Sequence, residues 1–123
     1  MILGLGTDIV DCGRIREALE RYADKFEERV FTNDERAYCR RMSDSTPHFA
    51  ARFAAKEAMR KAMGEGPDLN WQDVEVVRSE EGPVRIKVHG VAAEVYEKMG
   101  VKRCFLTLSH EHIAAVATVI LEG

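Results

Sequence analysis

The stretch RFAAKEAMRKAMGEG, residues 52–66, has the pattern of a helix that ends at a glycine-rich stop. Apolar residues recur at helical spacing and predict a core-facing arc made of Ala50, Phe53, Ala54, Ala58, Met59 and Ala62. Two charged residues, Glu57 and Lys61, fall inside this arc, one turn apart. Three basic residues share the opposite side, which we expect to be polar: Arg52, Lys56 and Arg60.

Glu57 and Lys61 need an explanation, because a charge turned toward a core must be paired, bind a metal or shift its pKa. One interpretation is a semi-buried ion pair between these two residues, which are neighbours at i and i+4 on the helix. The other is a carboxylate that binds a cation beside an ammonium that contacts a phosphate. The residues of this helix leave both interpretations open.

Asp8 is a second candidate, at the carboxyl end of an apolar strand in GLGTDIV, residues 4–10. An acid in this position commonly turns or caps the chain. If Asp8 and Glu57 lie close together, they offer two oxygen ligands, which is the number that magnesium typically takes from a protein. Neither acid alone is diagnostic of a metal site.

The rest of the chain predicts an α+β domain over residues 1–123, with a small, mostly antiparallel sheet packed with helices. The expected elements, in order, are a strand at 2–10, a helix at 12–29, a capping box and short helix from TNDE at 32–35, the helix launched by STP at 45–47 and ended by GEGP at 64–67, a hairpin with its turn at EEGP, 80–83, a helix at 91–99, and two strands joined by HEH at 110–112. The last strand is almost entirely apolar, which predicts that a partner subunit covers one of its faces.

Composition excludes several classes of function. A net charge of −3 gives no case for nucleic-acid binding, and no segment is apolar for long enough to span a bilayer. The N-terminus lacks the basic leader of a secretion signal. Three widely spaced cysteines, without a CxxC pair, argue against a disulfide framework and suit a reducing cytoplasm.

Two further groups have alternative interpretations. His110 and His112, in SHEH, could bind zinc from one side of an extended segment, or contact a phosphate at a strand end. Arg14, Arg21 and Lys25 form a stripe on the first helix, which is either a solvated face or a docking surface for an acidic partner.

Three motifs occur together in the order and spacing of a known family: GTDIVDCGRI at 6–15, RFAAKEAMRKAMGEG at 52–66 and LTLSHE at 106–111. With NWQDVEV at 70–76 and EGPVRIKVHG at 81–90, the chain resembles the holo-[acyl-carrier-protein] synthases over essentially its whole length. These are the small, single-domain type of the 4′-phosphopantetheinyl transferase superfamily.

The resemblance implies a magnesium-dependent transferase of fatty acid biosynthesis with the 4′-phosphopantetheinyl transferase fold. Such enzymes move 4′-phosphopantetheine from coenzyme A to a serine of apo acyl carrier protein and release adenosine 3′,5′-bisphosphate. Asp8 and Glu57 match the family's magnesium ligands, and Lys61 matches the lysine that contacts the phosphates. These three are the expected catalytic residues, and the base that accepts the serine proton is either Glu57 or a metal-bound water.

The resemblance also implies a cytoplasmic homotrimer with active sites between subunits. Coenzyme A is expected to meet Lys61, Arg52, His110 and Ser109, and the acidic carrier protein to meet Arg14, Arg21 and Lys25. Because Arg52 points away from Glu57 on the helical wheel, we expect it to serve a neighbour's site. The rival functions are a non-catalytic module that binds an acidic protein and a metal-dependent phosphate-ester hydrolase.

Overall fold

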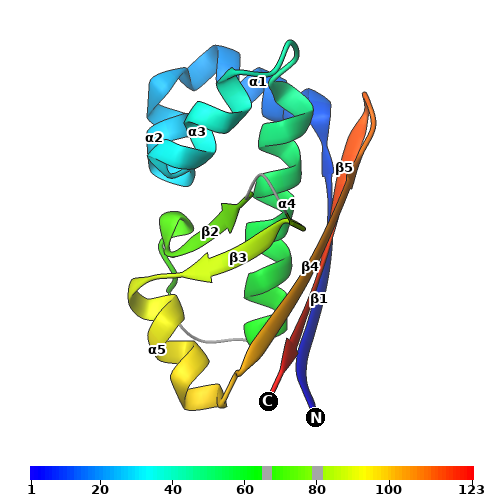
Figure 1. The fold of residues 1–123 in the computed structure, drawn as a ribbon. Coiled ribbons are helices and arrows are strands. Elements are labelled where there is room, and N and C mark those ends of the chain that lie inside the picture. The colour runs from blue at the N-terminus through cyan, green and yellow to red at the C-terminus, as the bar shows by residue number, and fades with distance from the viewer. Residues whose placement is uncertain (65–67, 79–81) are drawn as a thin grey trace.

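The computed structural model describes residues 1–64, 68–78 and 82–123 (Figure 1). Its elements, in order, are β1 Ile2–Asp11, α1 Cys12–Tyr22, α2 Asp24–Val30, α3 Asn33–Arg40, α4 Thr46–Met63, the short 3₁₀ helix η1 Trp71–Asp73, β2 Val74–Val77, β3 Arg85–Val88, α5 Gly90–Met99, β4 Arg103–His110 and β5 Ala114–Glu122. All strand pairs within these ranges are antiparallel, so the predicted α+β class is confirmed.

The strands form two separate sheets, where the sequence pattern predicted one. β1, β5 and β4 make a three-stranded sheet with β5 at its centre, and β2 pairs with β3 in a hairpin. Figure 1 shows the reason: α4 runs between the large sheet and the hairpin, with the shorter helices on the hairpin side. The molecule is therefore built in layers around α4.

This central position overturns the prediction that α4 has one polar face. Lys56 is 1% exposed and Arg52 is 3% exposed, so two of the three residues assigned to the polar side are buried, and Arg60 alone is exposed. Lys61, assigned to the core-facing arc, is exposed, and Glu57 is half-buried. A helix covered on two sides has no single core-facing arc, which is why the wheel misplaced these side chains.

Two glycines of β1 allow α4 to lie directly on the sheet. A Cβ atom on Gly6 would lie 1.9 Å from the carbonyl oxygen of Ala58, and one on Gly4 would lie 2.0 Å from that of Ala62. No larger side chain fits at either position without moving the helix. Asp8 follows Gly6 by two residues and so projects from the same face of β1, beside α4.

The predicted helix at 12–29 is in fact two helices. Ala23 has φ 47°, a value that L-residues other than glycine seldom adopt, and it separates α1 from α2. The change of direction allows Phe26 to pack edge-on against Phe31, with ring centroids 5.8 Å apart. Alanine is a good helix former, so the sequence gives no signal for the break.

Other local predictions are confirmed. Thr32 and Glu35 form both bonds of a capping box at the start of α3. The hairpin pairs Val74 with Val88 in register, and α4 ends at Met63 with Gly64 as its C-cap. The remaining residues of the predicted stop, 65–67, and the first two of the four residues of the predicted hairpin turn, 80 and 81, lie outside the described residues.

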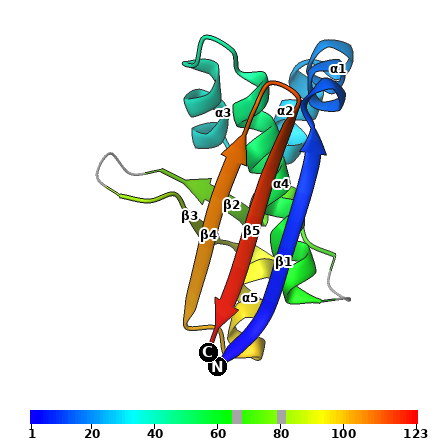
Figure 2. The same cartoon turned by 90° about the vertical axis from the view of Figure 1, so that its right-hand side faces the viewer.

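One face of the large sheet packs against α4, and the other is open (Figure 2). Ala115, Ala117, Val119 and Leu121 of β5 point to the covered face and are at most 1% exposed. The open face carries large apolar side chains that are strongly exposed in the single chain: Leu5 at 64%, Ile9 at 71% and Phe105 at 47%. In the described part of the chain, no helix combines the length and the apolar character that crossing a membrane requires.

Candidate active site

Lys61 reaches across from α4 to β1. Its Nζ donates to Asp8 Oδ1 at 3.0 Å and to the carbonyl oxygen of Thr7 at 2.9 Å. Of the described ion pairs within 4.0 Å, none joins Lys61 to Glu57, so the i, i+4 pair considered from the sequence does not form. The ammonium instead connects the helix to the end of the strand, and its side chain remains 55% exposed.

Asp8 and Glu57 line one pocket, with a volume of about 440 Å³. Most of the residues that line it are apolar, and three of them are aromatic: Phe26, Phe53 and Trp71. Arg14, from the first turn of α1, lies in the same wall. The structure therefore brings together the strand-end acid and the helical acid that the sequence analysis paired, in a pocket with an apolar wall.

The donor set of this pocket fits a hard cation that keeps part of its water shell. Magnesium commonly takes one or two carboxylates from the protein and completes its coordination with water and phosphate oxygens. No group of three or more His, Cys, Asp or Glu side chains able to hold a metal ion occurs in the described part of the chain, and a structural zinc site normally needs four such ligands. The zinc interpretation of His110 and His112 therefore gains no third ligand.

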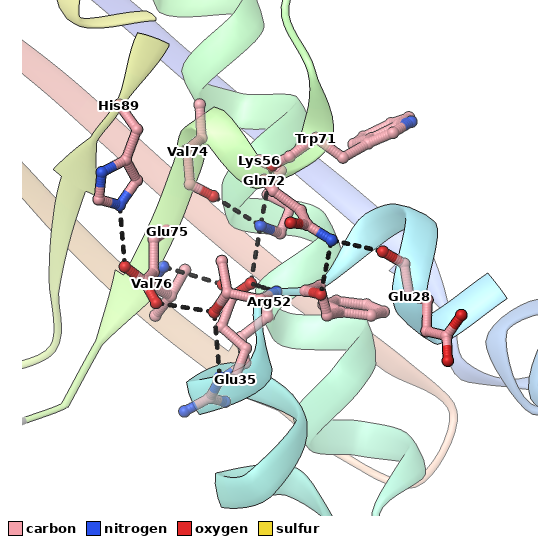
Figure 3. A network of polar contacts seen from close by, with 12 residues as sticks. Glu28, Glu35, Arg52, Lys56, Trp71, Gln72, Val74, Glu75, Val76 and His89 are labelled. Carbon is pink, nitrogen blue, oxygen red and sulfur yellow. Dashed lines mark hydrogen bonds and ion pairs between the residues drawn. The ribbon is translucent and has the colours of Figure 1, made fainter. Parts of the chain in front are cut away.

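Sequence reasoning missed a buried ion pair between Lys56 and Glu35, which lies close to the backbone of Trp71 (Figure 3). Lys56 Nζ lies 2.9 Å from Glu35 Oε1 and donates to the carbonyl oxygens of Trp71, at 3.0 Å, and Val74, at 2.6 Å. Burial lowers the pKa of Lys56 below its ordinary value, and the charge of Glu35 opposes that shift. The capping-box pattern identified Glu35 as a structural residue, but a helical wheel with one core-facing arc wrongly assigned Lys56 to the polar side.

Glu35 also connects the start of α3 to the hairpin. Its Oε1 accepts from the backbone N–H of Thr32 at 2.9 Å, and its Oε2 accepts from that of Val76 at 2.9 Å. The hydroxyl of Thr32 donates to Glu75 Oε2 at 2.7 Å, and the His89 ring lies 3.0 Å from the other oxygen of Glu75. Burial raises the pKa of Glu75, but the hydrogen bonds from Thr32 and His89 outweigh it and hold that pKa below its ordinary value.

Arg52 lies in a different pocket, of about 460 Å³, between α3 and β2. Its guanidinium carbon is 4.2 Å from the centroid of the Tyr38 ring, and its Nη1 donates to the carbonyl oxygen of His48 at 3.3 Å. Its Nε is buried and has no hydrogen-bond partner among the described residues. Arg41 and Arg78 line the same pocket and also lie over the Tyr38 ring, and three carboxylates line it as well: Asp34, Glu35 and Glu75.

His110 lies in a third pocket, of about 790 Å³, formed where the segment before α4 meets the turn between β4 and β5. The rings of His48 and His110 lie edge to face, with centroids 4.9 Å apart. Burial lowers the pKa of His48, and the neighbouring His110 lowers it further. Ser109 precedes His110 in β4 and lies on the exposed face of the sheet, paired in register with Val116.

The basic stripe predicted on the first helix is divided by the break at Ala23. Arg14 lines the Asp8–Glu57 pocket, Arg21 is exposed and lies 3.9 Å from Glu17, and Lys25 belongs to α2. The three residues therefore do not share one helical face, although all three are exposed.

Comparison with known proteins gives matches over nearly the whole chain. A sequence model of the 4′-phosphopantetheinyl transferase superfamily matches residues 4–117. The holo-[acyl-carrier-protein] synthase of Solibacter usitatus is 44% identical over 125 residues, which cover 100% of this chain and 100% of the relative. That of Anaeromyxobacter dehalogenans is 47% identical over 126 residues, which cover 100% of this chain and 98% of the relative.

Solved structures agree with the sequence matches. The crystal structure of the Neisseria meningitidis holo-[acyl-carrier-protein] synthase is similar with a TM-score of 0.90 and 29% identity, over 100% of both chains. The Helicobacter pylori holo-[acyl-carrier-protein] synthase in complex with coenzyme A is similar with a TM-score of 0.83 and 28% identity, over 96% of this chain and 99% of that chain. The family predicted from the three sequence motifs is confirmed: the chain belongs to the holo-[acyl-carrier-protein] synthases of the 4′-phosphopantetheinyl transferase superfamily.

Proposed function

We propose that residues 1–123 form one phosphopantetheinyl transferase domain, which transfers 4′-phosphopantetheine from coenzyme A to a serine of apo acyl carrier protein. The products are holo-acyl carrier protein, used in fatty acid biosynthesis, and adenosine 3′,5′-bisphosphate. The observation that carries this proposal is that Asp8 and Glu57 line one pocket, with Lys61 bonded to Asp8, in a chain of this family.

Asp8 and Glu57 would hold a magnesium ion, since both carboxylates line the pocket and their number suits that ion. When bound, magnesium supplies positive charge beside the pyrophosphate of coenzyme A. Lys61 is already held at the edge of this site by Asp8 and Thr7, and its exposed ammonium is free to contact a phosphate.

In the transfer step, the serine hydroxyl of the carrier attacks the phosphorus on the pantetheine side of the pyrophosphate. A new phosphorus–oxygen bond forms, the bond to the departing bisphosphate breaks, and Lys61 neutralises charge that develops on the leaving oxygens. Glu57, or a water beside it, accepts the serine proton.

The nucleotide end of coenzyme A carries a phosphate of its own and requires a second group of cations. The Arg52 pocket offers guanidinium groups and the His110 pocket offers imidazole rings, and each pocket is separate from the Asp8–Glu57 pocket in this chain. We therefore place Arg52, His110 and Ser109 on the nucleotide side of a site completed by a second subunit. This assignment keeps the neighbour's role for Arg52 and rests on its lying in a different pocket from Glu57.

The open face of the large sheet supports a homotrimer as the assembly. Rows of side chains cross it in register, with Leu5 opposite Ile120 and Ile120 opposite Phe105. Exposed apolar surface of this kind commonly marks a protein interface. The carrier protein would dock near the mouth of the Asp8–Glu57 pocket, where Arg14, Arg21 and Lys25 attract an acidic surface.

We place the reaction in the cytoplasm, where the free thiols of Cys12, Cys39 and Cys104 suit the reducing conditions. The test is to incubate the protein with coenzyme A, magnesium and apo carrier protein, and to weigh the carrier by mass spectrometry. A phosphopantetheine adduct on the carrier serine supports the proposal. Free phosphopantetheine with an unmodified carrier favours a hydrolase, and binding of the carrier without any product favours a non-catalytic module.

A further inference from the structure

Trp71 lines the active-site pocket together with Glu57, and it is the only tryptophan of the chain. Its ring stacks on Phe53 of α4, with centroids 5.0 Å apart and an interplanar angle of 26°. The guanidinium carbon of Arg60 lies 5.3 Å from the centroid of the indole. The position of this ring therefore determines the shape of one side of the pocket.

The backbone that carries Trp71 is held by Lys56. The Lys56 ammonium donates to the carbonyl oxygens of Trp71 and Val74, which are the first residue of η1 and the first residue of β2 (Figure 3). Its third contact is the ion pair with Glu35. An ammonium has three donors, so all of them are used and the geometry is fixed from three directions.

A charged residue is a costly way to fill this space. Lys56 and Glu35 are each 1% exposed, and buried ion pairs are often no more stabilising than apolar side chains of similar volume. What an apolar side chain could not supply is a directional contact to the Trp71 carbonyl. Lys56 also precedes Glu57 directly on α4, so a single turn of helix holds both the carboxylate and the backbone of the indole.

We propose that Lys56 is a positioning residue of the active site, which fixes the indole of Trp71 relative to Glu57 and thereby sets the shape of the substrate pocket. The expected effect on the kinetics rests on the transferase function proposed above. The structural link between Lys56 and Trp71 does not depend on any activity.

The principal test is the double variant Glu35→Gln with Lys56→Met. It removes both charges together, so no unpaired charge is left in the core, and the single carbonyl oxygen of the glutamine can still accept from one of the two N–H groups, of Thr32 or of Val76, that Glu35 binds. The Trp71 carbonyl loses its donor. Because Trp71 is the only tryptophan, the intrinsic fluorescence of the protein reports on this ring alone.

We expect acrylamide to quench the fluorescence of the folded double variant more strongly than that of the wild type, with a Stern–Volmer constant at least about twofold higher. Misplacement of a pocket wall by an ångström can cost up to about 100-fold in rate, and we expect kcat/KM to fall about tenfold. The loss should appear mainly in KM for coenzyme A or the carrier, because the indole shapes binding and the reacting groups are untouched.

A matched control is Glu27→Gln with Arg40→Met, which removes another buried carboxylate and one of its two arginine partners, and leaves the bond from Lys56 to the Trp71 carbonyl in place. This control should lose stability without a change in quenching or KM. A folded Glu35→Gln, Lys56→Met protein with native quenching and native KM would overturn the proposal, as would the same quenching change in the control.

Trp71→Ala provides a second test, which does not depend on whether the double variant folds. Lys56 contacts the carbonyl of residue 71 and not the indole, so this variant should keep its fold and raise KM to a similar degree. Adding the double substitution to Trp71→Ala should cause little further rise in KM. A native KM in folded Trp71→Ala would overturn the proposal. Failure of the wild type to transfer phosphopantetheine would overturn the proposed function, while the quenching comparison would still decide the link between Lys56 and Trp71.

Discussion

Lys61 Nζ lies 3.0 Å from Asp8 Oδ1, so the C-terminal half of α4 is bonded to β1, the strand that carries Asp8. Glu57, one turn earlier on the same helix, lines the same pocket as Asp8. This arrangement separates the roles of the two charged residues that stood out in the sequence. Lys61 links helix and strand at the pocket edge, and Glu57 is available within the pocket.

Substitution Glu57→Gln tests the role of the pocket carboxylate. The amide keeps the size of the side chain but lacks the negative charge needed to hold a cation or to accept a proton. We expect transfer to fall at least about 100-fold, in line with the loss of a catalytic acid or base. The melting temperature should change little, because Glu57 is only half-buried and lies in a pocket. Near-native turnover in the carrier-modification assay would contradict the assignment.

Substitution Lys61→Ala should remove activity but leave the fold in place. The side chain is 55% exposed, and exposed ion pairs contribute at most about 1 kcal/mol. Lys98→Ala, at an exposed position of α5, is the matched control and should affect neither activity nor stability. Urea unfolding, compared with initial rates, distinguishes the outcomes: a Lys61→Ala protein that is mainly unfolded would show that the bond to Asp8 is structural.

Substitution Gly6→Ala tests the close contact between β1 and α4. The added Cβ would lie 1.9 Å from the carbonyl oxygen of Ala58, so helix and strand must separate. Overpacking of a core typically costs about 1–3 kcal/mol, and here the rigid backbone makes the upper end of that range the expected loss in the free energy of unfolding. Gly13→Ala is the control, since its Cβ would come no closer than 3.3 Å to Asp11. Equal stability of the two variants would contradict this account of the GLG sequence.

Glu75 gives a pH-dependent prediction. Its pKa is lower in the folded protein than in the unfolded chain, so the folded state binds the proton less readily. The resulting stabilisation is present above the unfolded pKa of about 4.3 and is lost as the pH falls through the folded value. We therefore expect Glu75→Gln to be less stable than the wild type near pH 7, with a difference that shrinks toward pH 3. Chemical unfolding at several pH values measures it, and a difference independent of pH would show that the charge of Glu75 does not contribute.

The pairing of Asp8 with Glu57 was predicted from the family resemblance, and the residues alone placed each acid only in its own local element. Asp8 ends an apolar strand, and Glu57 lies on a strongly helical segment. The capping box at Thr32 and Glu35 was predictable from the residues alone, since both of its hydrogen bonds are local.

The features that were missed depend on tertiary packing. Lys56 is buried because α4 lies between the sheet and the hairpin, and a helical wheel with one core-facing arc cannot represent a helix covered on two sides. The break at Ala23 also has no local signal, because alanine favours a helix and yet α1 ends there. Trp71 escaped notice because its carbonyl, and not its side chain, is the group that Lys56 binds.

The mass of apo acyl carrier protein after incubation with the wild-type chain, coenzyme A and magnesium tests the central claim most directly. A transferase that uses Asp8 and Glu57 as proposed should add one phosphopantetheine to the carrier serine, release adenosine 3′,5′-bisphosphate in equal amount, and stop when a chelator removes the metal. A carrier of unchanged mass in the presence of magnesium, with all components shown to be intact, would contradict the account.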